Sequence, residues 1–137
     1  MADSDTITIT IPGHPQPEVK RNVVAGGRGF RVDSREAKSY KAYVVGLLRE
    51  VAPAQPWEGP IGLRAVFYRR KTTSYRKRDC WPTKKADAEN CAKILLDCLT
   101  TVGIWKDDAQ VCIEHLEKRF GEPERTELEI WRLGDDG

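Results

Sequence analysis

Residues 87–100 read DAENCAKILLDCLT, and this stretch predicts the helix around which the fold is organised. At about 100° per residue, one side of such a helix collects the apolar and small side chains, and the other side collects the polar ones. Cys91 and Cys98 belong to the first side, so we expect both to be small core residues. The apolar side is formed by Cys91, Ala92, Leu95, Leu96, Cys98 and Leu99.

Alternating apolar residues predict strands before and after this helix. Ile61, Leu63, Ala65 and Phe67 form one apolar face of the strand before it, and two strands follow over about 110–119 and 127–133. We therefore expect an α/β fold with a small mixed β-sheet and two main helices. The remaining predicted elements are a strand over 6–11, a Pro- and Gly-rich turn segment over 12–17, a mobile hairpin over 23–32 with Arg28 at its tip, and a helix from Asp33 or Ser34 to about Val51.

The length of 137 residues predicts a single domain over 1–137, with frayed tails at Met1–Asp5 and Gly134–Gly137. Hydrophobic residues make up 39% and charged residues 32%, which is typical of a globular chain. No apolar run is long enough to cross a membrane, and the N-terminus has no apolar signal segment. The four cysteines include no CxxC pair, so we expect no zinc site, reduced thiols and a cytoplasmic location.

Positive charge is concentrated between Arg64 and Lys85, where nine cations meet a single acid, Asp79. The chain as a whole has a net charge of only +2, so this segment is suited to a polyanionic partner. Tyr75 and Trp81 lie between the cations and are suited to stacking on bases. A solvated basic loop over about 70–86 is the alternative interpretation. The predicted nucleic-acid contacts of this segment are Arg69, Arg70, Lys71, Arg76, Lys77, Arg78, Lys84 and Lys85.

Carboxylates gather at two places in the sequence. Asp87 and Glu89 begin the predicted helix, with Lys93 on the same face, and Asp107 and Asp108 form a later turn. If the turn lies beside the helix start, the carboxylates converge into a site for Mg²⁺ or Mn²⁺, and Lys93 neutralises charge in a phosphoryl transition state. Each feature also has a structural explanation, as a helix cap, an i,i+4 ion pair or a plain turn. Acids beside a basic loop favour a metal-dependent nuclease.

These motifs resemble the RusA family of Holliday junction resolvases of bacteria and their phages, from about Ile7 to Leu133. The similarity rests on IPGHPQP at 11–17 followed by Lys20 and Arg21, on DAENCAK at 87–93, and on GIWKDDAQV at 103–111. It implies a homodimeric, Mg²⁺-dependent endodeoxyribonuclease that acts in recombination and repair, with Mn²⁺ as a substitute. Such an enzyme cuts four-way DNA junctions by paired symmetric nicks, and it has no small-molecule substrate or membrane partner.

The resemblance assigns roles by position. Asp87, Glu89 and Asp108 are implied to be metal-binding catalytic carboxylates, and Lys93 the catalytic lysine. Asp97 and Asp107 are implied to be supporting acids, and Lys20 and Arg21 are implied to be DNA contacts in addition to those of the basic loop.

The chain departs from the family pattern at two positions. Glu89 stands where the family usually has Asp, and Ala86 where a basic residue often precedes the first Asp. Three alternatives to a resolvase stay open. They are a weakly active or inactive branched-DNA-binding module, a single-strand nucleic-acid-binding module, and an interaction protein without metal.

Overall fold

The computed structural model describes residues 5–134, and a four-stranded sheet with the order β1-β6-β4-β5 organises them. Strand β4 pairs antiparallel with β6 and parallel with β5, so the sheet is mixed. With two helices packed against it, the structure confirms the predicted small α/β fold. The strands of this sheet are β1 (Thr6–Pro12), β4 (Ile61–Arg69), β5 (Val111–Phe120) and β6 (Arg125–Arg132).

The central strand β4 carries the core, as its alternation predicts. Ile61, Leu63, Ala65 and Phe67 are at most 1% exposed. Because successive side chains of a strand point to opposite faces, the residues between them face the other side of the sheet. There the indole of Trp131 on β6 lies directly over Gly62, and a Cβ at that position would be only 2.3 Å from the ring. The helix-covered face is therefore the main core.

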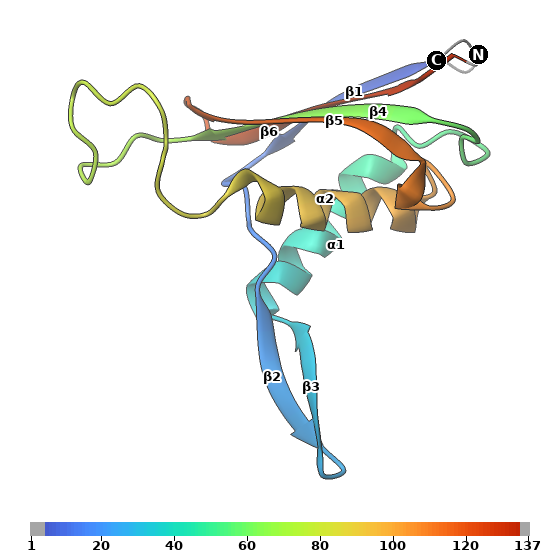
Figure 1. The fold of residues 1–137 in the computed structure, drawn as a ribbon, viewed down its shortest axis with the longest axis horizontal. Helices are drawn as coiled ribbons and strands as arrows, with labels where there is room; N and C mark the ends of the chain where they lie inside the picture. The colour runs from blue at the N-terminus through green and yellow to red at the C-terminus, as the bar shows by residue number, and fades with distance from the viewer. Residues whose placement is uncertain (1–4, 135–137) are drawn as a thin grey trace.

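Helices α1 (Arg35–Arg49) and α2 (Ala88–Val102) lie on the same face of the sheet (Figure 1). The hydroxyl of Ser34 accepts a hydrogen bond from the Ala37 amide and begins α1. Gly103 ends α2 in the left-handed conformation, with a φ of 81°. Helix α1 ends two residues before the expected Val51, and α2 continues two residues beyond the expected Thr100.

Helix α2 packs against both α1 and the sheet, so its buried surface is wider than one stripe. Cys91 and Cys98 are 2% and 1% exposed, which confirms them as core residues. Ile94, outside the predicted stripe, is completely buried, whereas Leu96 is only half-buried. A helix enclosed on two sides buries residues that an amphipathic pattern assigns to its flank.

Strands β2 (Lys20–Ala25) and β3 (Arg28–Asp33) form a separate hairpin that projects from the body of the molecule (Figure 1). Gly26 and Gly27 make its two-residue turn, with φ values of 59° and 75°. Two consecutive residues with positive φ are what a type I′ hairpin turn requires. The structure confirms the predicted hairpin, which is longer than 23–32, and Arg28 lies directly after the two glycines of the tip, where it begins β3 opposite Ala25.

The predicted frayed tails lie largely outside the described residues, at 1–4 and 135–137. Asp5 is held in place, since its carbonyl accepts a hydrogen bond of 2.9 Å from the Arg132 amide. Neither helix of the described part has the length and apolar character needed to cross a bilayer.

Candidate functional site

The amino end of α2 presents the first group of predicted site residues. The Asp87 carboxylate accepts a 2.8 Å hydrogen bond from the Asn90 amide and so caps the helix. Glu89 and Lys93 are exposed on the first turns. Although their spacing permits an ion pair, the two side chains form none with each other in the described structure. Both charged groups are therefore free to meet a ligand.

Arg69 lies beneath this helix end and is only 8% exposed. Its guanidinium donates to the Lys85 carbonyl at 2.9 Å and contacts the Cys91 sulfur at 3.5 Å. It therefore links β4 to the chain that enters α2. Arg69 also lines a pocket with Arg70, Lys84 and Lys85, so its role as a DNA contact stays a prediction.

Lys118 on β5 is a charged residue near the same helix end that the predicted site does not include. Its ammonium donates a 2.8 Å hydrogen bond to the Lys84 carbonyl. Burial, followed by the charge of Arg69, lowers the pKa of Lys118, while Asp87 acts in the opposite direction. Lys118 on β5 thus places a positive charge near Asp87. The chain has Ala86 at the position where the family often has a basic residue, so no cation comes from that position. The sequence signal for this residue is the basic pair Lys118 and Arg119 in the predicted strand.

The second group of carboxylates lies in a rigid turn after α2. Asp107 caps the short 3₁₀ helix η1 (Asp108–Gln110) by accepting a 2.9 Å hydrogen bond from the Ala109 amide. The Gln110 side chain accepts from the amides of Lys106 and Asp107, and it donates to the Trp57 and Gly59 carbonyls. The Asp107 carboxylate is thereby used within the turn, which leaves that of Asp108 available.

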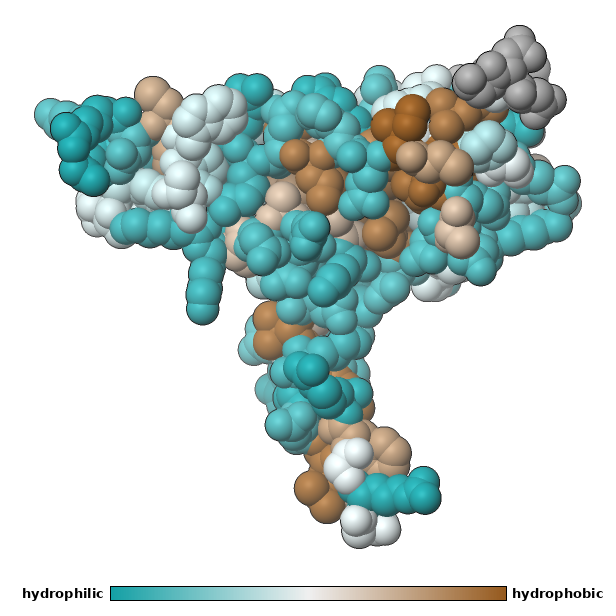
Figure 2. All heavy atoms as spheres, in the orientation of Figure 1, coloured by the Kyte–Doolittle hydropathy of each residue, from teal (hydrophilic) through white to brown (hydrophobic). Residues whose placement is uncertain are grey.

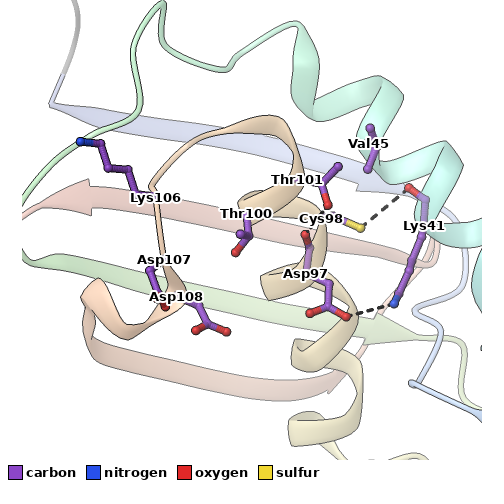
Figure 3. A pocket seen from close by; sticks show the side chains of 9 residues that line it. All are labelled: Lys41, Val45, Asp97, Cys98, Thr100, Thr101, Lys106, Asp107 and Asp108. Atoms are coloured by element: carbon purple, nitrogen blue, oxygen red, sulfur yellow. Dashed lines mark hydrogen bonds and ion pairs between the residues drawn. The ribbon is translucent and has the colours of Figure 1, made fainter. Parts of the chain in front are cut away.

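Figure 3 shows the pocket beside this turn, which lies between α1, α2 and η1. We call it the acidic pocket, because Asp97, Asp107 and Asp108 line it, and its volume is about 510 Å³. Lys41 on α1 bonds Asp97 at 3.0 Å and Asp33 at 2.8 Å. Burial alone would lower the pKa of Lys41, but these two hydrogen bonds outweigh it and the pKa is raised. A permanent cation therefore holds Asp97 in place.

The two groups of carboxylates do not converge within one chain. Asp87 and Glu89 lie at the start of α2, whereas Asp108 follows its end (Figure 1). Helix α2 is about 22 Å long, and Asp108 lines the acidic pocket together with Asp97 in the carboxyl-terminal half of the helix, away from Asp87 and Glu89 at its start. Within residues 5–134, no three His, Cys, Asp or Glu side chains are close enough together to hold a metal ion. The condition for convergence, a turn that lies beside the helix start, is therefore not met within one chain, because the turn packs against the other half of α2.

The basic loop over 70–86 extends beyond the end of the sheet and leads directly into Asp87 (Figure 1). Two of its lysines hold the loop together: Lys71 donates to the carbonyls of Lys77 and Asp79, and Lys84 donates to that of Ser74. In the hairpin, Lys20 is likewise paired, with Asp33. Within the described chain, the predicted contacts whose side chains are exposed and form no hydrogen bond or ion pair are Arg21, Arg70, Arg76, Lys77, Arg78 and Lys85.

The two aromatic residues of the loop differ in exposure. Tyr75 packs edge-on against Phe120, with ring centroids 4.9 Å apart, and its hydroxyl accepts from the Lys84 amide. Its ring is thus a structural support rather than a free stacking surface. Trp81 is 54% exposed, with the Arg119 guanidinium 4.9 Å from its ring. Of the two, only Trp81 presents a ring to a ligand.

The fold and its surface define a small α/β domain in which unpaired cations lead into a helix that begins with carboxylates. The endodeoxyribonuclease RusA family matches residues 12–131, and the chain therefore belongs to this family of endodeoxyribonucleases. The predicted family is confirmed. A search of curated proteins finds no match to the chain.

Proposed function

We propose that this protein is a Mg²⁺-dependent endodeoxyribonuclease that resolves four-way DNA junctions by paired symmetric nicks. Membership of the RusA family supports the nuclease class. The observation that carries the proposal is the basic loop, whose unpaired cations lead straight to the carboxylates at the amino end of α2. Cations hold the DNA backbone, while acids alone would repel it. Recombination and repair intermediates in the cytoplasm, where the four thiols stay reduced, are the expected substrates.

We further propose that two copies of the chain complete each metal site. One chain cannot bring Asp87 and Glu89 to Asp108, since α2 separates them. In a two-fold dimer, the amino end of one α2 can meet the acidic pocket of the other copy, and symmetry then produces two identical sites. Two sites related by a two-fold axis suit a substrate that needs two symmetric cuts.

In this proposal, each side chain has a distinct task. Asp87 and Glu89 of one copy and Asp108 of the other would hold the ion, which would make a bound water molecule more acidic. Lys93 lies on the same helix face as Glu89 and neutralises charge that develops on the scissile phosphate. Asp107 and Asp97 support Asp108, through the turn that Asp107 caps and the pocket wall that Lys41 holds.

The test is cleavage of a synthetic four-way junction in Mg²⁺, with Mn²⁺ as a second ion and linear duplex as the comparison. We expect paired nicks in the junction, and their loss with EDTA and with Asp108→Asn. Glu114→Gln is the matched control, because Glu114 is an exposed acid on β5 without a partner in the described part. Equal cleavage of junction and duplex would contradict junction selectivity, and cleavage unaffected by EDTA would contradict the metal.

Glu89 supports a second candidate, a branched-DNA-binding protein with weak or absent cleavage. The longer side chain moves the carboxylate by more than an ångström, and a shift of this size can matter at a reacting centre. If the protein binds junctions tightly but does not cut them, and Glu89→Asp produces cutting, this second function is correct.

A further inference from the structure

The hairpin formed by β2 and β3 has exposed apolar side chains that its own chain does not cover. Val24 is 77% exposed and Phe30 is 48% exposed, although both are large hydrophobic residues. Figure 2 shows apolar surface at the far end of the projecting hairpin, next to hydrophilic side chains. A two-stranded hairpin is only marginally stable by itself in water, so this exposed surface calls for an explanation.

The register of the hairpin places the apolar side chains among arginines. Residues paired across the strands lie on the same face, so Val23 and Phe30 share a face with Arg21 and Arg28. Arg31 lies on the opposite face, across from Asn22. The charges exposed on both faces are therefore positive.

No acid of the hairpin is available to neutralise these arginines. Its single carboxylate, that of Asp33, is bonded by Lys20 at 2.7 Å and by Lys41 at 2.8 Å. Arg21, Arg28 and Arg31 form no side-chain hydrogen bond or ion pair in the described chain. This charge pattern complements a polyanion such as the phosphate backbone of DNA.

The same Asp33 contacts fix the direction of the hairpin. Lys41 ties Asp33 to α1, and the Ser34 amide donates to the Val19 carbonyl at 2.8 Å, which joins the two ends of the hairpin at its base. The hairpin is therefore an anchored arm. The major groove of DNA is wide enough to admit a two-stranded β-ribbon, and this hairpin is such a ribbon.

We propose that this hairpin is a second DNA-binding surface, separate from the basic loop, and that Phe30 stacks on bases exposed at the branch point of the junction. The proposal rests on the junction-binding function proposed above. Arg21, Arg28 and Arg31 contact phosphates on either side of the ribbon. Branch points interrupt the base stack, so a ring inserted there replaces a missing neighbour, as apolar wedges do in architectural proteins.

The test measures binding in EDTA, without cleavage, to a four-way junction and to linear duplex of equal length. We expect Phe30→Ala to weaken junction binding on the order of tenfold, with duplex binding unchanged, and Phe30→Trp to retain it. Ile113→Ala is the matched control, because Ile113 on β5 is 46% exposed and should not affect binding. The double variant Arg28→Ala with Arg31→Ala should bind both DNAs more weakly. The slope of the logarithm of the binding constant against the logarithm of the salt concentration should fall in magnitude by about two.

Several outcomes would overturn the inference, and they separate it from the proposed function. If the wild type prefers the junction and Phe30→Ala binds like the wild type, the proposed role of the hairpin in DNA binding is wrong, and the resolvase proposal stands. If Phe30→Ala instead dissociates a wild-type dimer in sedimentation, the apolar side chains cover a second copy. If the wild type shows no preference for the junction, both proposals fail.

Discussion

Single residues already determine which thiols of this protein can react. Burial raises the pKa of Cys98 to about 11 and also raises that of Cys91, so both remain protonated at neutral pH. Cys80 and Cys112 are exposed. We therefore expect a thiol reagent to modify two cysteines in the native protein and all four in denaturant, as counted by mass spectrometry. Rapid labelling of Cys91 or Cys98 in the native state would contradict the burial of α2.

Gly62 is another position where one residue controls packing, because it leaves room for the Trp131 ring. Gly62→Ala should destabilise the protein by about 1–3 kcal/mol through overpacking, measured by denaturant unfolding. Gly46 on α1 provides the control, since a Cβ there meets no atom within 4 Å. Gly46→Ala should stabilise by about 0.5–1 kcal/mol, because alanine favours helix. If both changes had the same effect on the free energy of unfolding, the Trp131 ring would have to move aside at no cost.

At the scale of elements, Asp33 joins the two strands of the hairpin through Lys20 and connects the hairpin to α1 through Lys41. Hydrogen bonds from Lys20 and then Lys41 lower the pKa of Asp33 in the folded state. The stability it adds is thus complete above the unfolded pKa, near 4, and is lost as the pH falls below that value through the lowered folded pKa. Asp33→Asn should remove about 1 kcal/mol at pH 7 and little at low pH.

The measurement is the thermal midpoint of each protein between pH 2 and pH 7. The wild type should lose stability more steeply in acid than Asp33→Asn, and the curves should approach each other. Glu114→Gln, which removes an exposed carboxylate without a partner in residues 5–134, should follow the wild type. Parallel curves for the wild type and Asp33→Asn would mean that Asp33 contributes no pH-dependent stability.

At the scale of the whole molecule, the separation of the two carboxylate groups along α2 leads to a test by mixing subunits. Asp87→Asn and Asp108→Asn should each abolish cutting. A mixed dimer of the two variants retains one intact site if the sites are shared between copies, and none if each copy has its own. After unfolding and refolding together, we expect about a quarter of wild-type sites to nick the junction, without paired cuts. No recovery of nicking would contradict shared sites.

The strands and helix starts follow from local physics, which the sequence contains. Alternation at Ile61, Leu63, Ala65 and Phe67 produces a strand with one buried face, and Ser34 and Asp87 supply the oxygens that cap helices. The family could also be predicted from the short motifs at 87–93 and 103–111, since each motif is a continuous stretch of sequence.

Other features depend on how the elements pack, and no local pattern contains them. Arg69 looks like one more cation of the basic loop, yet β4 carries it under α2, where it bonds the Lys85 carbonyl. Lys118 reaches the same helix end because β5 lies beside β4 in parallel. The sequence by itself determined the elements, the charge pattern and the family. Only the tertiary structure placed Asp108 beside the carboxyl-terminal half of α2 and away from Asp87, because the part of a helix against which a later turn packs depends on contacts that no local pattern contains.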